Sequence, residues 1–370
     1  MVASTNQGGQ WTQARKTAES LRKLGVDVDL RICDGNIPTQ VDLVHAFSAA
    51  CLPTVLAAKQ LKLPVMVSPI FWPRVEYFRR LEYRDFLSPM EHWLIRCRHS
   101  MIGKLLLDGK VRRSPMLIYR YRGLEGNAYE NMNQERKCFI LADHLLPNAE
   151  SEMSAIENTL DISKDYTVIP NAIDDIVFSA SCNSQIQPEL PGKYVLSVSV
   201  ISPRKNTLKL VRACKVLGIP LVLIGPPELS SHLSRAYYRQ CRKESSPQII
   251  FHGPITHELL PSFYSKASVH ALVSWYETPG LASLEAAAVG CAVVSTSVGT
   301  AQEYFGDDAE YCDPADQKTI ERAIMRAWEK CPSEILKERV LSRFTWDRAA
   351  ELTLQAYLKV LEGKERSNHG

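Results

Sequence analysis

Long apolar runs and a large charge imbalance are both missing from this chain of 370 residues. No uninterrupted apolar stretch approaches the roughly 20 residues that a membrane-crossing helix requires. The formal net charge is only +3, so bulk charge argues against a nucleic-acid-binding protein. Residues 1–6 also lack the basic and then apolar pattern of a signal peptide. We therefore expect a cytoplasmic protein.

Paired cysteine motifs are missing as well, although the chain has ten cysteines. No Cys-x-x-Cys pair occurs, and several cysteines stand in apolar runs, where cysteine behaves as a small hydrophobic residue. This pattern suggests neither a zinc site nor a disulfide framework. The single Asp-x-Asp sequence, Asp27-Val-Asp29, lies in an alternating strand pattern. We expect it to be structural, and we expect no metal site.

Short apolar runs alternate with helical patterns along the chain, which is typical of α/β folds with parallel sheets. After a very short strand within residues 1–4 and a helix at 11–24, the strands expected in the first half are 26–32, 43–47, 64–68, 144–146 and 167–169. Those of the second half are 194–200, 220–224, 248–251, 269–273 and 291–295, separated by helices at 208–217, 258–267, 281–289 and 319–328.

The repetition of strands and helices starts again after about residue 185, and residues 183–192 are polar with prolines and a glycine, as in a linker. We therefore predict two Rossmann-like, doubly wound parallel-sheet domains that face a central cleft. The first domain spans residues 1–172 and the second 173–344. A C-terminal helix at 345–362 is expected to pack back on the first domain.

Residues 277–290 are the most informative stretch of the sequence. Glu277 and Glu285 stand eight residues apart, one before a Pro-Gly turn and one inside a small apolar helix. Pro279 suits the first helical position, where its missing N–H costs nothing. Gly290 suits the left-handed residue that closes a helix.

The free N–H groups around Gly280 and Leu281 would form an anion site at the start of this helix. Glu285 lies five residues beyond Gly280, which is about 7 Å along a helix axis. A phosphate site flanked by two carboxylates suits a nucleoside diphosphate that carries a sugar. The alternative is a Glu285 that is solvated or paired with a lysine, although its apolar neighbours make an unpaired carboxylate costly to bury.

Further motifs accompany this stretch in a fixed order. They are Val168-Ile-Pro-Asn-Ala-Ile-Asp174, Pro203-Arg-Lys-Asn206, Ile224-Gly225, Phe251-His-Gly253, Leu260-Pro-Ser-Phe-Tyr264 and Val298-Gly-Thr-Ala-Gln-Glu303. Together with residues 277–290 they resemble the retaining glycosyltransferase family 4 (glycosyl transferases group 1), which has the GT-B fold. The resemblance covers nearly the whole chain and is strongest from Thr167 to Pro314.

The resemblance implies a hexosyltransferase that moves a sugar from a UDP- or GDP-sugar to a hydroxyl acceptor with retention of configuration. The expected setting is the assembly of a cell-surface polysaccharide or glycolipid. The leaving phosphate itself takes the acceptor proton in such a same-face displacement. Neither a metal ion nor another cofactor is then needed.

The resemblance also assigns roles to side chains. Glu285 should hydrogen-bond the ribose hydroxyls, and Glu277 should face the transferred sugar. Lys205 matches the lysine that neutralises the departing diphosphate, a role that a compact ammonium fills well. Arg204 is our candidate for a second catalytic cation. An exposed Arg204–Lys205 loop pair is the alternative.

Backbone groups complete the site that the resemblance implies. Amides near Thr278, Gly280 and Leu281 should contact the diphosphate or the sugar. Gly9 matches a glycine whose backbone approaches the phosphates from the other domain, although Gly8-Gly9 alone would be merely a turn. Glu303 matches a common family glutamate, to which we assign no role.

Three features depart from the family pattern. Ser199-Val200 stand where the family has a Gly-Arg pair, and we hypothesise that Arg204 supplies the lost charge. The stretch Ser68-Pro-Ile-Phe-Trp72 lacks the histidine that many members place there, and Pro279 removes one backbone donor. The alternatives are therefore a non-catalytic GT-B nucleotide-binding scaffold, or another GT-B enzyme such as a nucleotide-sugar epimerase.

Residues 74–122 form a basic segment, with twelve Lys and Arg against five acidic residues and several interleaved aromatic residues. Such a mixture fits the interface of an anionic membrane. We hypothesise that this face docks on the inner face of the membrane to reach a lipid-linked acceptor. An ordinary solvated surface is the alternative, and no motif indicates nucleic-acid binding.

Overall fold

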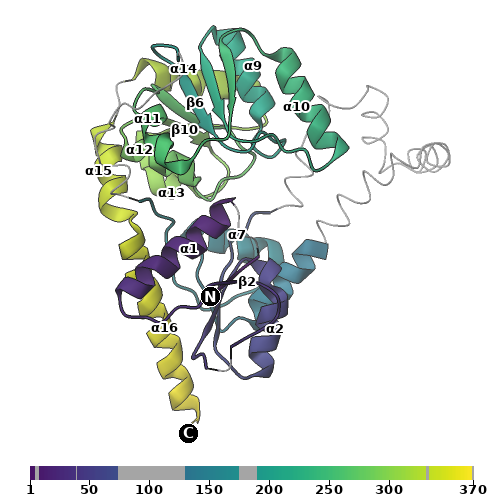
Figure 1. The fold of residues 1–370 in the computed structure, drawn as a ribbon, viewed down its shortest axis with the longest axis vertical. Coiled ribbons are helices and arrows are strands. Elements are labelled where there is room, and N and C mark those ends of the chain that lie inside the picture. The colour runs from purple at the N-terminus through teal and green to yellow at the C-terminus, as the bar shows by residue number, and fades with distance from the viewer. Residues whose placement is uncertain (5–7, 39, 74–129, 175–189, 331–332, 369–370) are drawn as a thin grey trace, which may run out of the picture.

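The computed structural model describes residues 1–4, 8–38, 40–73, 130–174, 190–330 and 333–368. They form two parallel sheets, one above the other in Figure 1, each flanked by helices. The predicted α/β class with two Rossmann-like sheets is confirmed. The limits of the two domains, drawn at residues 172 and 344, stay a prediction.

The first sheet has the order β2-β1-β3-β4-β5, and all its strand pairs are parallel. Its strands are β1 (Val2–Ala3), β2 (Arg31–Ile32), β3 (Val44–Phe47), β4 (Val65–Ser68) and β5 (His144–Leu145). The helices of this half are α1 (Gly8–Lys23), the 3-10 turn η1 (Ala49–Cys51), α2 (Leu52–Gln60), a helix at 130–141 and α7 (Glu150–Leu160). One face of the sheet packs on α2, α7 and helix 130–141, and the other packs on α1.

The second sheet has the order β11-β10-β9-β6-β7-β8, again with parallel pairs. Its strands are β6 (Val195–Val198), β7 (Leu221–Ile224), β8 (Ile249–Gly253), β9 (Val269–Leu272), β10 (Ala292–Thr296) and β11 (Glu310–Cys312). The helices and turns around it are α9 (Thr207–Leu217), α10 (His232–Glu244), η4 (His257–Leu259), α11 (Leu260–Tyr264), α12 (Leu281–Ala288), α13 (Ala301–Phe305), η5 (Gly306–Asp308) and α14 (Gln317–Glu329).

Alternating strand residues fill the two cores of this second half, as the period of two along a strand requires. Val195 and Leu221 pack under α9 and α14. Leu196 and Val222 point to the opposite face and pack under α11, α12 and α13. Apolar residues on both faces explain why these strands are continuous hydrophobic runs in the sequence.

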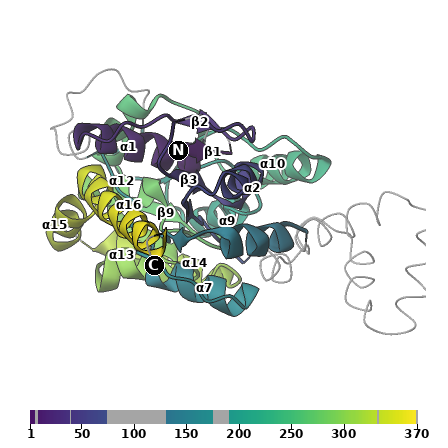
Figure 2. The same cartoon turned by 90° about the horizontal axis from the view of Figure 1, so that it is seen from below.

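The chain returns to the first half at its C-terminal end. After α15 (Glu334–Arg343), α16 (Trp346–Asn368) runs down one side of Figure 1, and Figure 2 shows the same helix from below. Trp346, Ala350 and Tyr357 of α16 join a core with Ala18 and Leu21 of α1. The hydroxyl of Tyr357 also lies 2.7 Å from Nδ1 of His45 on β3.

Of the strands expected in the first half, 26–32 is much shorter than the sequence predicts and 167–169 does not form. Residues 26–32 supply only β2, because β2 pairs with β1 and β1 has two residues. At 167–169 there is no strand but an isolated bridge between Leu145 and Tyr166. The N–H of Ile169 still donates to the carbonyl of Pro147 at 2.8 Å, but Pro147 has no N–H to donate in return, so the pairing beyond Leu145 stays one-sided.

The helix expected at 258–267 is divided into η4 and α11. Pro261 occupies the first turn of α11 and cannot donate the backbone bond that a continuous helix needs. The remaining expected strands and helices of the second half are confirmed, with ends shifted by a few residues. Strand β11 was not predicted, since its sequence Glu310-Tyr-Cys312 is short and half polar.

Side chains and main chain join the two halves. Tyr304 of α13 donates to the carbonyl of Asn148 at 2.6 Å and accepts from the N–H of Asn171 at 2.8 Å. Lys16 of α1 pairs with Asp174 at 2.6 Å. These contacts set how the carboxyl ends of the two sheets face each other.

Candidate active site

The candidate site lies where the strand order of the second sheet reverses. Strand β6 pairs with β7 on one side and with β9 on the other, so the connections from β6 and β9 leave in opposite directions. Such a switch point leaves a crevice beyond the carboxyl ends of the strands. The segment with Lys205 follows β6, and the segment with Glu277 follows β9. Topology therefore explains why two residues distant in sequence are adjacent.

Lys205 and Glu277 form a buried ion pair. Lys205 Nζ lies 2.5 Å from Glu277 Oε1, and the two side chains are only 14% and 5% exposed. Burial alone would raise the pKa of Glu277, but the positive charges of Lys205 and Arg204 lower it below its usual value. Burial lowers the pKa of Lys205, against the attraction of Glu277. An exposed loop pair, the alternative reading of Lys205, is thus wrong.

The loop that carries Lys205 is fastened to the segment that carries Glu277. Asn206 has a left-handed backbone, and its Nδ2 donates to the carbonyls of Val273 and Pro314 at 3.1 and 2.9 Å. The N–H of Trp275 donates to the carbonyl of Arg204 at 3.1 Å. The ammonium of Lys205 is therefore positioned by its neighbours.

The main chain of Glu277 is equally fixed. Its N–H donates to the carbonyl of Val298 and its carbonyl accepts from the N–H of Thr300. A Cβ on Gly299, which has a φ of +115°, would lie 2.1 Å from the carbonyl oxygen of Glu277. Only glycine permits this approach, so the glycine of the Val298–Glu303 motif serves the position of Glu277.

The start of α12 faces the same carboxylate. The helix begins at Leu281 with Gly280 as its N-cap, so the expectation that Pro279 is the first helical residue is wrong. Gly280 has a φ of +94° and, as a glycine, no side chain of its own to cap the helix. A Cβ on Gly280 would lie 3.3 Å from Oε2 of Glu277. The positive end of α12 therefore opens beside Glu277.

The expectation for the end of this helix is confirmed. Gly290 has a φ of +90° just past its end, as predicted for the closing residue. Gly9, in the first turn of α1, lies beside Leu281, because a Cβ on Gly9 would be 3.7 Å from the Leu281 side chain. The carbonyl of Thr278 accepts from Nδ2 of Asn171 at 2.9 Å. The structure thus brings the predicted backbone residues to the seam between the halves.

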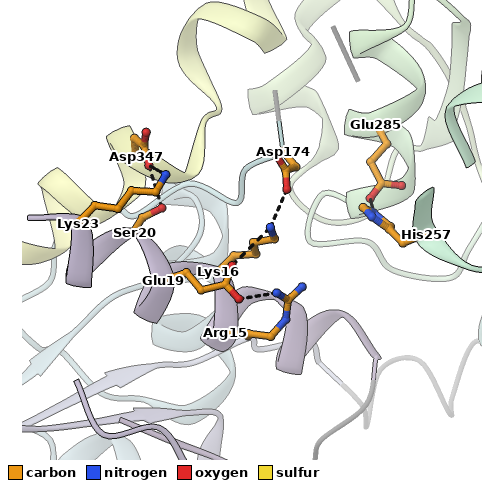
Figure 3. Close-up of polar contacts among 9 residues, drawn as sticks. All are labelled: Arg15, Lys16, Glu19, Ser20, Lys23, Asp174, His257, Glu285 and Asp347. Atoms are coloured by element: carbon orange, nitrogen blue, oxygen red, sulfur yellow. Dashed lines mark hydrogen bonds and ion pairs between the residues drawn. The ribbon is translucent and has the colours of Figure 1, made fainter. Parts of the chain in front are cut away.

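Glu285 lies on α12 and is 8% exposed. His257 Nε2 is 2.8 Å from its Oε1, and the hydroxyl of Tyr264 donates to its Oε2 at 3.0 Å, as Figure 3 shows for the histidine. The alternative of a solvated or lysine-paired Glu285 is wrong. Hydrogen bonding to Glu285 raises the pKa of His257, whereas burial raises the pKa of Tyr264.

Sequence reasoning missed His257. It lies between two motifs that the resemblance used, yet no spacing rule links a histidine in a short turn to a helix 28 residues away. Figure 3 shows the His257–Glu285 pair to the right of Asp174 and Lys16. Asp174 and Glu258 add negative charge near this imidazole.

Arg204 and Glu303 both reach the first half. The Arg204 guanidinium lies 5.8 Å from the ring centre of Trp72, within the range of a cation–π contact. Glu303 accepts from the N–H groups of Glu150 and Ser151 at 3.0 and 2.7 Å. It therefore caps the start of α7 in the opposite half, a role that the sequence did not reveal.

The predicted departures from the family pattern are placed as follows. Val200, where the family has an arginine, is 43% exposed beyond the end of β6.

Within the described ranges, no group of three or more His, Cys, Asp or Glu side chains could hold a metal ion. Asp29 of the Asp-x-Asp sequence pairs with Arg31 at 2.7 Å. The basic segment 74–122 lies outside the described residues.

None of the helices in the described part of the chain is both long and apolar enough to cross a membrane.

The fold and the buried charge pair at the switch point define a two-domain α/β protein of the GT-B class. Two solved structures share this architecture over nearly the full chain. Sucrose-phosphate synthase from Thermosynechococcus elongatus aligns with a TM-score of 0.73 and 18% identity, covering 98% of both chains. Anabaena HepE in complex with UDP-glucose aligns with a TM-score of 0.60 and 13% identity, covering 100% of this chain and 99% of that one.

Sequence comparison finds a family match in the second half. Residues 183–339, which are less than half of the chain, match the model described as glycosyl transferases group 1. The serotype-specific mannosyltransferase WbdA of Escherichia coli is 25% identical over 252 residues, or 63% of this chain. The O-antigen chain mannosyltransferase B of Escherichia coli is 29% identical over 174 residues, or 44% of this chain. These alignments span 31% and 45% of the two relatives.

Proposed function

We propose that the chain is a retaining glycosyltransferase of family 4, which transfers a hexose from a nucleoside-diphosphate sugar to a hydroxyl acceptor. The observation that carries this proposal is the buried Lys205–Glu277 pair beside the open start of α12. The group 1 match and the mannosyltransferase relatives support it. Because those relatives include O-antigen enzymes, we place the reaction in cell-surface polysaccharide or glycolipid assembly.

The charge of the site suits a departing diphosphate. Lys205 and Arg204 contribute two positive charges against one negative charge on Glu277, and the start of α12 adds its partial positive charge. Preorganised positive charge stabilises the negative charge that develops on a leaving phosphate. This supply of charge supports our proposal that transfer proceeds without a metal ion or other cofactor.

Glu277 holds Lys205 in place and lies next to Gly280, where the transferred sugar would rest against backbone amides. We assign Lys205 and Arg204 to the leaving diphosphate, and Glu277 to the sugar hydroxyls. Gly9 would let the start of α1 approach the phosphates from the opposite half. The leaving phosphate would accept the proton of the attacking hydroxyl on the same face of the sugar.

Glu285 is assigned to the ribose. A carboxylate has about four acceptor positions, and His257 and Tyr264 use two of them. The remaining positions can accept the 2′- and 3′-hydroxyls of a nucleoside. The donor is a UDP- or GDP-sugar, by the UDP-glucose complex of the HepE neighbour and by the mannosyltransferase relatives.

A thermal-shift panel of UDP, GDP and their sugar conjugates tests this assignment. One nucleotide should raise the unfolding temperature, and the shift should disappear in Glu285→Ala. Transfer from the matching labelled sugar nucleotide should fall by about a hundredfold or more in Lys205→Ala. Full transfer activity in both variants would show that the site is elsewhere.

The non-catalytic scaffold remains a second candidate, because Val200 replaces the family arginine and is exposed. A nucleotide-sugar epimerase is the other enzyme of this class that we consider. Product analysis separates the three. A transferase yields a glycoside, an epimerase yields a second sugar nucleotide, and a scaffold yields nucleotide protection without turnover.

For the acceptor side we propose that segment 74–122 contacts an anionic inner-membrane surface and gives access to a lipid-linked acceptor. The segment has twelve basic residues and only five acidic ones, which supports this proposal. Flotation with anionic and neutral liposomes at low salt tests it. Binding should require the anionic lipid and should weaken as salt rises.

A further inference from the structure

The loop after β4 adopts a backbone conformation that its sequence does not favour. Ile70 has a φ of +48°, and a β-branched residue is a genuine outlier in this left-handed region. Such strain costs on the order of 1–3 kcal/mol and persists only where the surrounding structure enforces it. The loop is therefore held in a specific shape.

Glu152 of α7 enforces that shape. Its side chain is completely buried, and its two oxygens accept from the N–H groups of Phe71 and Asn148, both at 2.5 Å. Phe71 is 1% exposed and packs edge-on against Phe139, with ring centres 6.3 Å apart. The loop is thus anchored at Phe71, directly before the next residue of the loop.

That next residue is Trp72. It is half-buried, and the Arg204 guanidinium lies 5.8 Å from its ring centre. Arg204 also acts electrostatically on Glu277. A single side chain, that of Arg204, therefore links Trp72 to the proposed reacting centre. A strained loop and a buried carboxylate together place a large flat ring beside Arg204.

We propose that Trp72 is the acceptor platform, and that the acceptor is a hexopyranoside whose ring packs on the indole. This inference rests on the proposed function. A pyranose has an apolar C–H face that suits an aromatic ring and hydroxyls at its rim. With the ring on Trp72, a rim hydroxyl reaches toward Arg204 and Glu277. Glu152 is the positioning residue that sets the loop.

Binding of simple glycosides to the full chain tests the platform. Methyl α-D-mannopyranoside, methyl α-D-glucopyranoside and methyl β-D-galactopyranoside are titrated with and without saturating UDP or GDP, and binding is followed by saturation-transfer NMR. At least one glycoside should bind. Trp72→Ala should weaken it about tenfold or more, and Trp72→Phe should retain part of the affinity. The nucleotide affinity should not change.

Trp328→Ala is the matched control. Trp328 lies on α14, away from the site, and its ring packs under the ammonium of Lys193. This variant should leave glycoside binding unchanged. Equal binding by wild type and Trp72→Ala overturns the platform, and so does the absence of binding by all three glycosides. If the wild-type protein binds a glycoside through Trp72 but binds neither UDP nor GDP, the proposed donor site alone is refuted.

The positioning role of Glu152 has its own readout. The indole N–H resonance of Trp72, assigned by its absence in Trp72→Phe, should shift when a glycoside binds. Glu152→Gln keeps one acceptor oxygen and should weaken glycoside binding less than Glu152→Ala does. If both variants fold, bind nucleotide and shift the Trp72 resonance as wild type does, Glu152 does not position the platform.

Discussion

Removal of Lys205 exposes how strongly the site depends on its ion pair. Lys205→Ala leaves Glu277 with a side chain that is 5% exposed and without its closest cation. Breaking a buried pair by removing one partner costs about 3–5 kcal/mol. Arg204 still lowers the pKa of Glu277, so we expect the lower end, about 3 kcal/mol of unfolding free energy.

A double-mutant cycle measures this coupling. Lys205→Met and Glu277→Gln should each destabilise the protein, and the double variant should cost about 2 kcal/mol less than their sum. Urea unfolding followed by circular dichroism provides the free energies. Lys318→Ala is the control, since Lys318 is 74% exposed in its pair with Glu321 and should cost less than about 1 kcal/mol. Additive effects at Lys205 and Glu277 would refute a coupled buried pair.

Variants at three further positions test other contacts of the candidate site. Gly299→Ala should lower the unfolding free energy by more than about 2 kcal/mol and abolish the nucleotide-induced thermal shift, because its Cβ would meet the Glu277 carbonyl at 2.1 Å; an unchanged shift would contradict this. Glu303→Ala should cost about 1 kcal/mol in urea unfolding by removing the cap of α7, and Glu303→Gln should cost less. The pKa of His257 is raised above its ordinary value, so its charge-dependent stabilisation is present below pH 6.5 and is lost as pH rises through the raised value. Nucleotide affinity measured by calorimetry should fall over the same interval, and His257→Gln should remove that step.

The sequence predicted the fold well wherever strands are buried on both faces. Strands such as β7 and β9 are continuous apolar runs because helices cover both sides of the sheet. It failed where pairing depended on a partner's length or on a proline. Segment 26–32 pairs over only two residues, and Pro147 has no N–H to complete the pairing between the end of β5 and residues 167–169.

The candidate site was predicted only in part, and the division has a physical cause. The residues of the 277–290 stretch lie on one short helix and the turns beside it, so their relative positions follow from their spacing in the sequence. His257 reaches Glu285, and Trp72 reaches Arg204, through tertiary packing, so no local spacing distinguishes them from other loop residues. The first helical residue was misplaced because Gly280, with its positive φ, takes the cap position that separates Pro279 from the helix.

The loss of the family arginine at Val200 has a consequence for the charge of the crevice. Val200 lies directly beyond β6, whereas Arg204 lies four residues further along and reaches the ring of Trp72. A cation at Arg204 therefore contacts the loop of the first half while its field still acts on Glu277. We propose that Arg204 supplies, from beside the Trp72 loop, the charge that the family pattern places under the donor diphosphate. One guanidinium would then serve both the leaving group and the loop that we propose binds the acceptor.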